Sequence, residues 1–515
     1  MRGHQKLVKF RELLYRQFFR RKDAIFELID ALSTSAKHCN SVVQLSKSPF
    51  FTRQYPSITD AITDGLEVAD WSAIQKLAWK FCRSDVKVPY HRFLLDCTPN
   101  ARPHAKTVAD RSIVHYPNPA PGNKPICAGH QYSVATYLPP GNSDERQRWC
   151  VPLCAKRVPS HEKGHEFGMK QLSDIIGNLG LENETCVSIG DTAYGTEACH
   201  QSVVQTNNHV HIVRLKSNRN VFELFNKQPT GRKGRKKIYG EKMSLNNPAT
   251  FLPYAQYMTM QHTSKKGKQL TISLKAWDNM TFRSSRQFDA YKYPFRLIQA
   301  IVTDSTGKAI FKHPLWLAVF GDKRMQISLP ECFSNYMDRY DIEHYFRFGK
   351  QRLLMNAFQS SDVEHEENWW QLCTLAYVQL FLSKDFAQGM PEPWERYLPQ
   401  FKHKAMLQLS SASHVQRGFA KVLETIGTPA QPPIPRGNPL GRKLGQCPSK
   451  RPENPVIFKK NFAKKKKAVI SSGLKNQTVL TKPQNIDAVL KQLNLMIGNL
   501  DISMQEFCDF ALDSS

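Results

Sequence analysis

The chain has 515 residues, more than one hydrophobic core usually holds, so we expect two or three domains with additional tails. Lys plus Arg number 72 and Asp plus Glu number 44, and the formal net charge of +28 favours a polyanionic partner, with nucleic acid the leading candidate over a merely solvated basic surface. The sequence excludes a membrane span of ~20 apolar residues, a signal peptide with an uninterrupted apolar centre, and a dense disulfide scaffold, which together predict a soluble cytoplasmic protein with reduced cysteines.

Residues 1–88 are predicted to form a helical N-terminal domain. Apolar residues recur there at intervals of three and four, the spacing that places them on one face of an α-helix. DNA binding is a role that this domain could have, but no helix-turn-helix pattern identifies it. The clearest apolar positions are Phe26, Leu28, Ile29 and Leu32, followed by Ile74, Leu77, Ala78 and Phe81.

Residues 89–216 change to short apolar runs separated by Pro, Gly and Asn, which is typical of successive strands. The runs RFLLDCT, SIVHYPN, HQYSVATYL and RWCVPLCAKR come first, and a helical stretch, EFGMKQLSDIIGNLGL, follows them. The strand TCVSIGD, a further helix and the strand HVHIVRLKS complete this region. Strands followed by alternating helix and strand indicate an α/β domain with a mixed sheet.

The α/β pattern is interrupted over residues 217–310, where basic, turn-rich segments alternate with strand-like runs such as LTISLKAW. We interpret this region as a β-rich insertion. The α/β pattern resumes over 311–407 with the strand HPLWLAVFGD and two helices, predicted over about residues 331–357 and 365–384. Residues 408–515 combine Pro, Gly, Lys and Arg with few apolar residues, which predicts a basic, largely flexible tail with one amphipathic helix at its end.

Three carboxylates lie where metal ligands commonly gather. Asp96 and Asp191 end the apolar runs FLLD and CVSIGD, so each is predicted at the margin of a sheet, and Glu343 is predicted on the later helix. Hard cations such as Mg²⁺ bind carboxylate oxygens, and two such ions about 3.5 to 4 Å apart can stabilise the attacking and leaving oxygens of a phosphoryl displacement. Taken alone, each acid is more simply explained as a turn or cap residue.

The helix around Glu343 adds two cations and an aromatic residue. Tyr336, Arg339, Glu343 and Lys350 are offset by 0, 3, 7 and 14 residues, which at ~100° per residue keeps them within about 60° of one another on one helical face. Beside a phosphodiester, Arg339 and Lys350 could hold flanking phosphates. The ordinary alternative is a solvated helix face on which Arg339 and Glu343 form an i,i+4 ion pair.

The spacing Tyr-x2-Arg-x3-Glu-x6-Lys resembles the signature of the DDE transposases of bacterial insertion sequences, in particular the cut-and-paste type. The resemblance covers about residues 90–360 and implies a ribonuclease H-like catalytic core in which a β-rich insertion separates the second aspartate from the glutamate. The separation of 152 residues (343 − 191) between Asp191 and Glu343 has room for such an insertion. The N-terminal domain and the tail are covered less securely.

The resemblance also implies a mechanism. Asp96, Asp191 and Glu343 would be the catalytic, metal-binding residues for two Mg²⁺ ions, with Mn²⁺ able to substitute, and water and then a DNA 3′-hydroxyl would be the nucleophiles. The other three residues of the signature would contact the DNA backbone. The partners would be double-stranded terminal inverted repeats and target DNA. The enzyme would act as a homodimer or larger assembly on paired ends, at the bacterial nucleoid.

Further DNA contacts are predicted in the insertion and the tail. Trp277 is the candidate for holding a flipped base, as an aromatic residue of the insertion can in such relatives, because stacking offsets part of the unstacking cost. Core packing is the alternative for Trp277, and Trp316 is assigned to the core. Lys464–Lys467 of the tail and a basic run of the insertion suit phosphate contacts, unless they are only solvated charges. The run consists of Arg232, Lys233, Arg235, Lys236 and Lys237.

One other cluster has the residue types of a zinc site. Cys150, Cys154, His161 and His165 form C-x3-C-x6-H-x3-H, but the central spacer is shorter than the ~12 residues of a zinc finger. Reduced strand cysteines and surface histidines are therefore the simpler interpretation.

The sequence as a whole predicts a DNA transposase that cleaves transposon ends and joins their 3′-hydroxyls to target DNA. Two alternatives stay open. One is a catalytically inactive, transposase-derived DNA-binding protein, and the other is a ribonuclease H-like nuclease that cuts without joining.

Overall fold

The computed structural model describes residues 3–35, 39–116, 125–140, 148–206, 208–225, 237–263, 268–386, 411–435, 441, 443–447 and 449–458. The chain divides into two compact units. The first unit comprises residues 1–258, 274–300 and 315–457, and the second comprises 259–273, 301–314 and the residues from 458 onward. Within the described residues, no helix has the length and apolar character that crossing a membrane requires.

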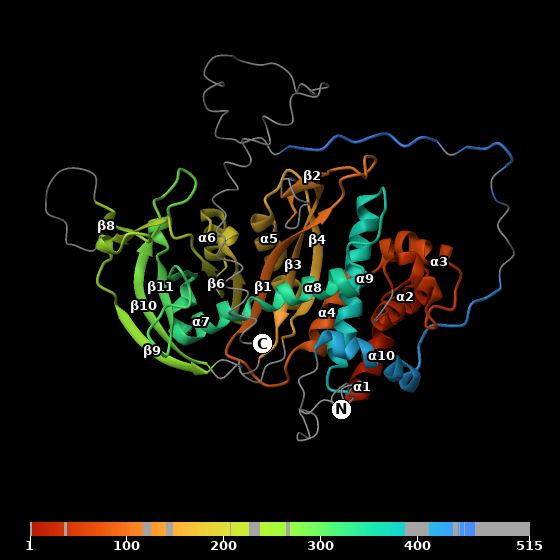
Figure 1. Cartoon of the computed structure of the whole chain (residues 1–515), viewed down its shortest axis with the longest axis horizontal. Helices are drawn as coiled ribbons and strands as arrows, with labels where there is room; N and C mark the ends of the chain where they lie inside the picture. The colour runs from red at the N-terminus through yellow and green to blue at the C-terminus, as the bar shows by residue number, and fades with distance from the viewer. Residues whose placement is uncertain are drawn as a thin grey trace, which may run out of the picture. The chain divides into compact units, whose positions relative to one another are not determined.

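The N-terminal part of the first unit is helical, and both helices predicted from the apolar spacing are present (Figure 1). Arg11 fixes the packing of these helices, because its buried guanidinium lies 2.5 Å from Asp30 and 2.8 Å from Gln379 of a later helix. A fully buried arginine requires such partners. The elements are α1 (Gly3–Tyr15), α2 (Lys22–Thr34), η1 (Val42–Lys47), α3 (Pro56–Asp60), η2 (Ala61–Gly65), η3 (Leu66–Val68) and α4 (Trp71–Cys82).

A mixed sheet with helices follows, as the sequence predicted. β1 and β3 are antiparallel, β4 is antiparallel to β3, β5 is parallel to β1, and β6 is parallel to β5, which gives the order β4-β3-β1-β5-β6 with β2 beside β3. The helix α5 connects β4 to β5, and α6 connects β5 to β6 (Figure 1). The elements are β1 (His91–Ala101), β2 (Ser112–His115), β3 (Ile126–Leu138), β4 (Val151–Val158), α5 (Gly164–Leu179), β5 (Cys186–Gly190), η4 (Thr192–Tyr194), α6 (Glu197–Val204) and β6 (His209–Arg214).

The position predicted for Asp96 at a strand end was wrong. β1 continues through Asp96 to Ala101, because its antiparallel pairing with β3 persists to the pair Ala101 and Gly129. The parallel pairing of β1 with β5 covers only His91–Leu94. Asp96 therefore lies just beyond the carboxyl end of the parallel pairing, although it is inside a strand.

Those strand residues of 217–310 that belong to the first unit, together with β12, extend the sheet of that unit. β12 pairs antiparallel with both β6 and β11, while β10 pairs with β7 and β7 with β8. In the second unit, Thr303 forms an isolated bridge with Ala309. The elements are β7 (Asn220–Leu224), β8 (Tyr239–Ser244), η5 (Pro248–Thr250), β9 (Gln256–Thr263), β10 (Gln269–Thr281), η6 (Ala290–Lys292), β11 (Phe295–Asp304), β12 (Leu315–Phe320) and η7 (Asp322–Gln326).

The single helix predicted over 331–357 is two helices, α7 (Leu329–Asp338) and α8 (Asp341–Arg352). At their junction, the N–H of Arg339 donates to Tyr336 O and that of Tyr340 to Met337 O, at 3.2 and 3.4 Å. These i to i−3 bonds tighten the turn locally. The angles expected for one straight helix therefore do not carry across the junction. The next predicted helix is present as α9 (Val363–Leu382).

Helix α10 (Ala412–Ile426) lies where the sequence predicted a largely flexible tail. Its buried face includes Val415, Phe419 and Leu423, and Gln416 donates a hydrogen bond to Leu32 O of α2 at 3.1 Å. The composition of the long Pro- and Lys-rich segment concealed this short amphipathic helix. Lys464–Lys467 and the predicted terminal helix lie outside the described residues.

We expect Phe419→Ala to lower the free energy of unfolding by about 3 to 5 kcal/mol, because truncating a fully buried phenylalanine removes its apolar contacts and leaves a cavity. Lys421→Ala on the exposed face of the same helix is the control, with an effect within about 0.5 kcal/mol. Urea denaturation monitored by circular dichroism measures both. Equal stabilities of the two variants would mean that α10 is not docked.

Candidate active site

Two aspartates lie at the edge of the sheet where the parallel strands β1 and β5 end. Asp191 directly follows β5, and its Oδ1 accepts a hydrogen bond from the backbone N–H of Ala193 at 2.9 Å. Asp96 follows the parallel-paired part of β1, and its Oδ1 accepts from the N–H of Cys97 at 2.7 Å. Because the strands are neighbours, their ends bring the two carboxylates to the same edge.

The guanidinium of Arg339 joins Asp96 to the third carboxylate. Arg339 Nη1 lies 3.4 Å from Asp96 Oδ2, and Nη2 lies 2.8 Å from Glu343 Oε1. The side chain of Arg339 is only 3% exposed, and those of Asp96 and Glu343 are 18% and 22% exposed. The i,i+4 pair of Arg339 and Glu343 is therefore present, but it is enclosed at the sheet edge and not on a solvated helix face.

The electrostatics of Asp96 reflect this crowding of acids. Burial raises the pKa of Asp96 to about 7, and the negative charges of Asp191 and Glu343 add to the rise, while the positive charge of Arg339 opposes it. Asp191 and Glu343, the other two carboxylates predicted from the sequence, therefore both act electrostatically on Asp96. The charges of all three act on Arg339, and the charge of Asp96 also acts on the amine of Lys350.

The other two residues of the signature have internal contacts. Tyr336 is 2% exposed, and the guanidinium of Arg339 lies 6.0 Å from its ring centre. Lys350 Nζ donates to Thr98 Oγ1 at 2.5 Å and to Pro99 O at 3.1 Å, and burial lowers the pKa of this amine to about 8. In this arrangement, both side chains contact the protein, where the sequence predicted contacts with the DNA backbone.

The structure favours the core alternative for Trp277. Trp277 is 4% exposed, its Nε1–H donates to Leu252 O at 2.9 Å, and its ring lies 5.8 Å from that of Trp316. Trp316 is buried, as predicted. Of the basic run in the insertion, Lys237 is described and lies 4.9 Å from the ring of Phe225, while Arg232, Lys233, Arg235 and Lys236 lie outside the described residues.

A cation that the sequence did not single out lies close to the loop of Asp191. Arg219 is exposed, and its Nη2 donates to the carbonyl of Gly195 at 2.8 Å. Its guanidinium also lies 5.6 Å from the ring of Phe282. A cation fixed in this way costs little further entropy when it binds a phosphate.

The three carboxylates fit a divalent metal ion by donor type but not by arrangement. Carboxylate oxygens are the ligands that Mg²⁺ and Mn²⁺ prefer. However, no group of three or more His, Cys, Asp or Glu side chains in the described part of the chain is arranged to hold a metal ion. The guanidinium of Arg339 stands between Asp96 and Glu343.

The same finding applies to the zinc-like cluster. Cys150 Sγ lies 3.6 Å from the carbonyl of Asp341, whereas the side chain of His161 is 79% exposed. Among the described residues, these cysteines and histidines are not gathered into a metal site.

A comparison with known families supplies the assignment. The model of the family described as DDE superfamily endonuclease matches residues 13–280, which is 268 of the 515 residues. The chain belongs to the DDE superfamily endonucleases. The matched region contains Asp96 and Asp191 and ends before Glu343. Membership points to nuclease or transposase activity on DNA, and endonucleases of this superfamily normally use divalent metal ions. A comparison with curated proteins finds no match.

Sequence reasoning missed a buried polar network that anchors β1 of this DDE endonuclease. Glu366 of α9 is fully buried and accepts hydrogen bonds from Asn100 Nδ2 at 2.8 Å, Arg102 Nε at 2.7 Å and the hydroxyl of Tyr132 at 2.9 Å. His130 Nδ1 lies 3.0 Å from the same carboxylate. An acidic residue within the otherwise apolar face of a helix is the sequence signal that could have found it.

A group of buried histidines lies beneath the Asp191 loop of the endonuclease. Ser188 Oγ lies 2.7 Å from His209 Nε2 and 2.7 Å from His211 Nδ1. His200 stacks on Phe320 with ring centres 4.3 Å apart. Burial lowers the pKa of His200 to about 3, of His209 to about 4 and of His211 to about 3. All three rings are therefore neutral in the folded protein at neutral pH.

We expect His200→Phe to become more stable relative to the wild type as the pH falls from 7 to 5. The folded protein keeps His200 neutral, but the unfolded chain protonates it below about pH 6.5, so the wild type loses about 1.4 kcal/mol per pH unit there, or about 2 kcal/mol at pH 5. Urea denaturation of both proteins at the two pH values measures the change. A difference in stability that does not vary with pH would contradict the prediction.

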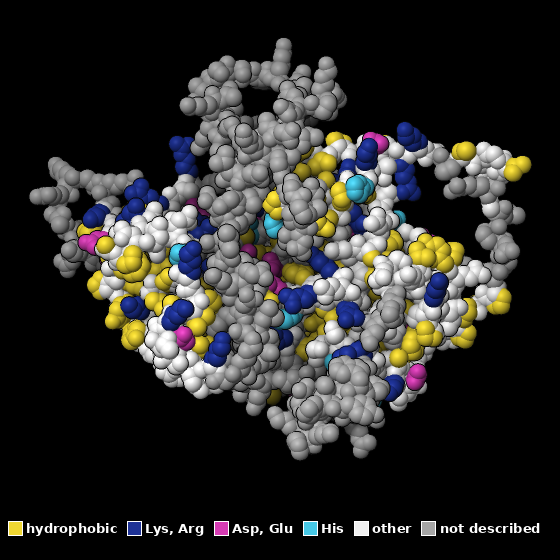
Figure 2. All heavy atoms as spheres, viewed as in Figure 1, with side chains coloured by type: hydrophobic (Ala, Val, Ile, Leu, Met, Phe, Trp, Pro, Cys, Tyr) yellow, Lys and Arg dark blue, Asp and Glu magenta, His cyan; other side chains and the backbone are white. Residues whose placement is uncertain are grey.

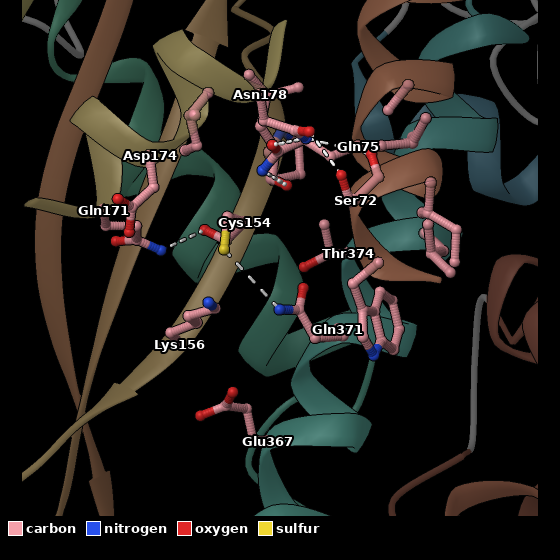
Figure 3. A pocket seen from close by; sticks show the side chains of 18 of the residues that line it. Ser72, Gln75, Cys154, Lys156, Gln171, Asp174, Asn178, Glu367, Gln371 and Thr374 are labelled. Atoms are coloured by element: carbon pink, nitrogen blue, oxygen red, sulfur yellow. Dashed lines mark hydrogen bonds between the residues drawn. The ribbon is translucent and has the colours of Figure 1, made fainter. Parts of the chain in front are cut away.

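A cavity of about 610 Å³ lies between α4, α5, β4 and α9, and none of the three carboxylates lines it (Figure 3). Side chains of its wall bond the outer edge of β4. Gln75 donates to Leu153 O at 3.3 Å, Gln371 Oε1 lies 3.5 Å from the N–H of Ala155, and Glu367 accepts from the N–H of Arg157 at 2.9 Å. These three polar side chains therefore form hydrogen bonds with the backbone along the outer edge of β4.

Proposed function

We propose that the chain is a DNA transposase that cleaves transposon ends and joins their 3′-hydroxyls to target DNA. The observation that carries this proposal is the meeting of three residues distant in sequence. Asp96 and Asp191 share one edge of the sheet, and Arg339 links Asp96 to Glu343. The glutamate of the signature thus joins the two aspartates that lie in the matched family region.

The proposed catalytic core is ribonuclease H-like. The order β4-β3-β1-β5-β6 supports it, with three antiparallel strands followed by two strands parallel to β1. In the proposed division, residues 89–216 and 311–407 form this core, 217–310 form its insertion and 1–88 form the N-terminal domain.

Asp96, Asp191 and Glu343 are the proposed ligands of two Mg²⁺ ions, for which Mn²⁺ would substitute. Such ions, when bound, stabilise the attacking and leaving oxygens of a phosphoryl displacement. The protein's own contribution is to deliver the three carboxylates from β1, the β5 loop and α8 to one edge of the sheet.

Basic side chains of the first unit are the proposed contacts with the DNA backbone. Arg219 beside the Asp191 loop and Lys237 of the insertion lie in the first unit. Figure 2 shows Lys and Arg side chains spread over the described part of one face, with acidic side chains in a hollow near its middle. The net charge of +28 suits a long duplex partner. We further propose that a homodimer or larger assembly acts on paired ends, at the bacterial nucleoid.

The test begins with a search for inverted repeats in the DNA that flanks the reading frame. A duplex carrying one repeat, labelled at the transferred strand, is incubated with the protein, Mg²⁺ and a supercoiled target plasmid. Labelled plasmid indicates strand joining and supports the proposal. Cleaved ends without labelled plasmid indicate a nuclease that only cuts, and DNA binding without cleavage in either Mg²⁺ or Mn²⁺ indicates an inactive DNA-binding protein.

A further inference from the structure

The guanidinium of Arg339 contacts two of the three carboxylates that are proposed as metal ligands. It lies 3.4 Å from Asp96 and 2.8 Å from Glu343, and its side chain is almost entirely buried. Asp191 also lies within electrostatic range of Arg339. An arginine placed to hold DNA phosphates would be expected at the surface, so its enclosure among the acids needs another explanation.

A guanidinium and a divalent metal ion compete for the same carboxylate oxygens. Both are cations that bind the carboxylate oxygens of Asp and Glu, so an oxygen that is engaged by the guanidinium is less available as a metal ligand. Three carboxylates without a cation would also repel one another, since the negative charges of Asp191 and Glu343 raise the pKa of Asp96. The site therefore holds one kind of cation at a time between Asp96 and Glu343.

We propose that Arg339 is a built-in counter-ion of the catalytic carboxylates, which holds Asp96 and Glu343 until a divalent ion displaces it and a DNA phosphate accepts it. This inference rests on the proposed function, because it assigns the regulation of the same site. A phosphate offers Arg339 the same paired oxygens that a carboxylate does. The metal site would then be complete only when DNA is present.

The backbone around Arg339 is suited to this exchange. Arg339 lies at the junction of α7 and α8, where the N–H groups of Arg339, Tyr340 and Ile342 make i to i−3 bonds of 3.2 to 3.4 Å. Such bonds are weaker than those within a regular α-helix. A small change of the junction can therefore redirect the side chain of Arg339 without unwinding either helix.

The first experiment measures Mn²⁺ binding to the full chain without DNA by isothermal titration calorimetry. Arg339→Gln is expected to bind Mn²⁺ at least about tenfold more tightly than the wild type, because the competing charge is gone. Arg339→Lys, which keeps the charge, is expected to stay within about threefold of the wild type. The double variant Arg339→Gln with Glu343→Gln should lose the gain in Mn²⁺ affinity. That loss would show that the additional Mn²⁺ binding occurs at this site.

Arg92→Gln is the matched control. Arg92 pairs with Asp338 of α7 at 2.9 Å, so this variant also removes a partly buried arginine bonded to the same helical region. Its Mn²⁺ affinity should equal that of the wild type. The proposal is overturned if Arg339→Gln binds Mn²⁺ no more tightly than the wild type, or if Arg92→Gln or Arg339→Lys shows the same gain.

Loss of Arg339 also leaves carboxylates without their cation, so folding is followed by circular dichroism. A variant that is unfolded without metal and folds on addition of millimolar Mn²⁺ supports the proposal, because the metal then replaces the guanidinium. A variant that stays unfolded in Mn²⁺ contradicts it.

A second experiment tests whether the guanidinium of Arg339 contacts a DNA phosphate once a divalent ion is bound. The affinity for the end duplex is measured against salt concentration by fluorescence anisotropy, in Ca²⁺ and without divalent ions. The quantity compared is the steepness with which the logarithm of the binding constant falls with the logarithm of the salt concentration. In Ca²⁺, this slope should be larger for the wild type than for Arg339→Gln by about 0.9, the value of one phosphate contact. Without divalent ions, the two slopes should agree. Equal slopes in Ca²⁺ would exclude the exchange.

Failure of this inference is distinguishable from failure of the proposed function. If the wild type does not cut transposon ends with any divalent ion, the proposed function is wrong, whatever the Mn²⁺ affinities are. If the wild type cuts and joins but Arg339→Gln gains no Mn²⁺ affinity, the transposase stands and Arg339 is only a structural clamp.

Discussion

Replacing Asp96 by Asn, Asp191 by Asn or Glu343 by Gln is expected to lower the rate of DNA cleavage by at least about 10³-fold. Each substitution removes one negative charge from the proposed metal ligands, and residues that act as one catalytic unit lose nearly all activity when any member is removed. The amides keep the size of the side chains, and the carbonyl oxygen of an asparagine can still accept the hydrogen bonds from Cys97 or Ala193. Initial rates of nicking of a labelled end duplex in Mg²⁺ measure the loss.

The control for these variants is Asp174→Asn. Asp174 is an exposed residue of α5. It lines the cavity between α4, α5, β4 and α9, which none of the three carboxylates lines. It should retain wild-type cleavage. A triad variant that kept more than about a tenth of the wild-type rate in Mg²⁺ would remove that residue from the proposed triad.

Glu366→Ala is expected to lower the free energy of unfolding by about 3 to 5 kcal/mol, the usual cost of removing one partner of a buried ion pair. The substitution leaves Arg102 with 3% of its side chain exposed and without its carboxylate partner, and it removes acceptors for Asn100 and Tyr132. Burial alone would raise the pKa of Glu366, but the hydrogen bond of His130 and the charge of Arg102 lower it to about 2.

The sign of this pKa shift adds a second measurement. Because the folded protein holds Glu366 ionised, its contribution is present above its ordinary pKa of 4.5 and is lost as the pH falls towards 2. Urea denaturation at pH 7 measures the main effect. Glu166→Ala, which removes an exposed ion pair with Lys163, is the control and should change stability by no more than about 1 kcal/mol. Similar values for the two variants would mean that the Glu366 network does not stabilise the fold.

Much of the α/β framework could be predicted from the sequence because its signals are local. Alternating or continuous apolar runs bounded by Gly and Pro correspond to β1, β3, β5 and β12, and the spacing of apolar residues corresponds to α2 and α9. The length of β1 beyond Asp96 depended instead on its partner β3, which local sequence does not reveal. The docking of α10 likewise depends on α2 and α9, more than 25 residues away in the chain.

The members of the candidate site are proposed from the sequence, whereas their contacts could not be predicted from it. Residue spacing brought Tyr336, Arg339, Glu343 and Lys350 together, and two strand-associated aspartates completed the set. Spacing does not report burial, however, so it could not show that Arg339 faces Asp96 and Glu343 instead of solvent. Because the sequence does not report burial, it also left Trp277 with two interpretations, base stacking and core packing. In the structure, the indole N–H donates to Leu252 O.

The bonded outer edge of β4 has a consequence for how copies of the protein meet. An open strand edge recruits strands from other chains, either in ordered assembly or in aggregation. On β4, the carbonyl of Leu153 and the N–H groups of Ala155 and Arg157 are already engaged by side chains of α4 and α9. Strand addition at this edge is therefore blocked. Protomers that gather on paired DNA ends would have to recognise each other through side chains or through the DNA itself.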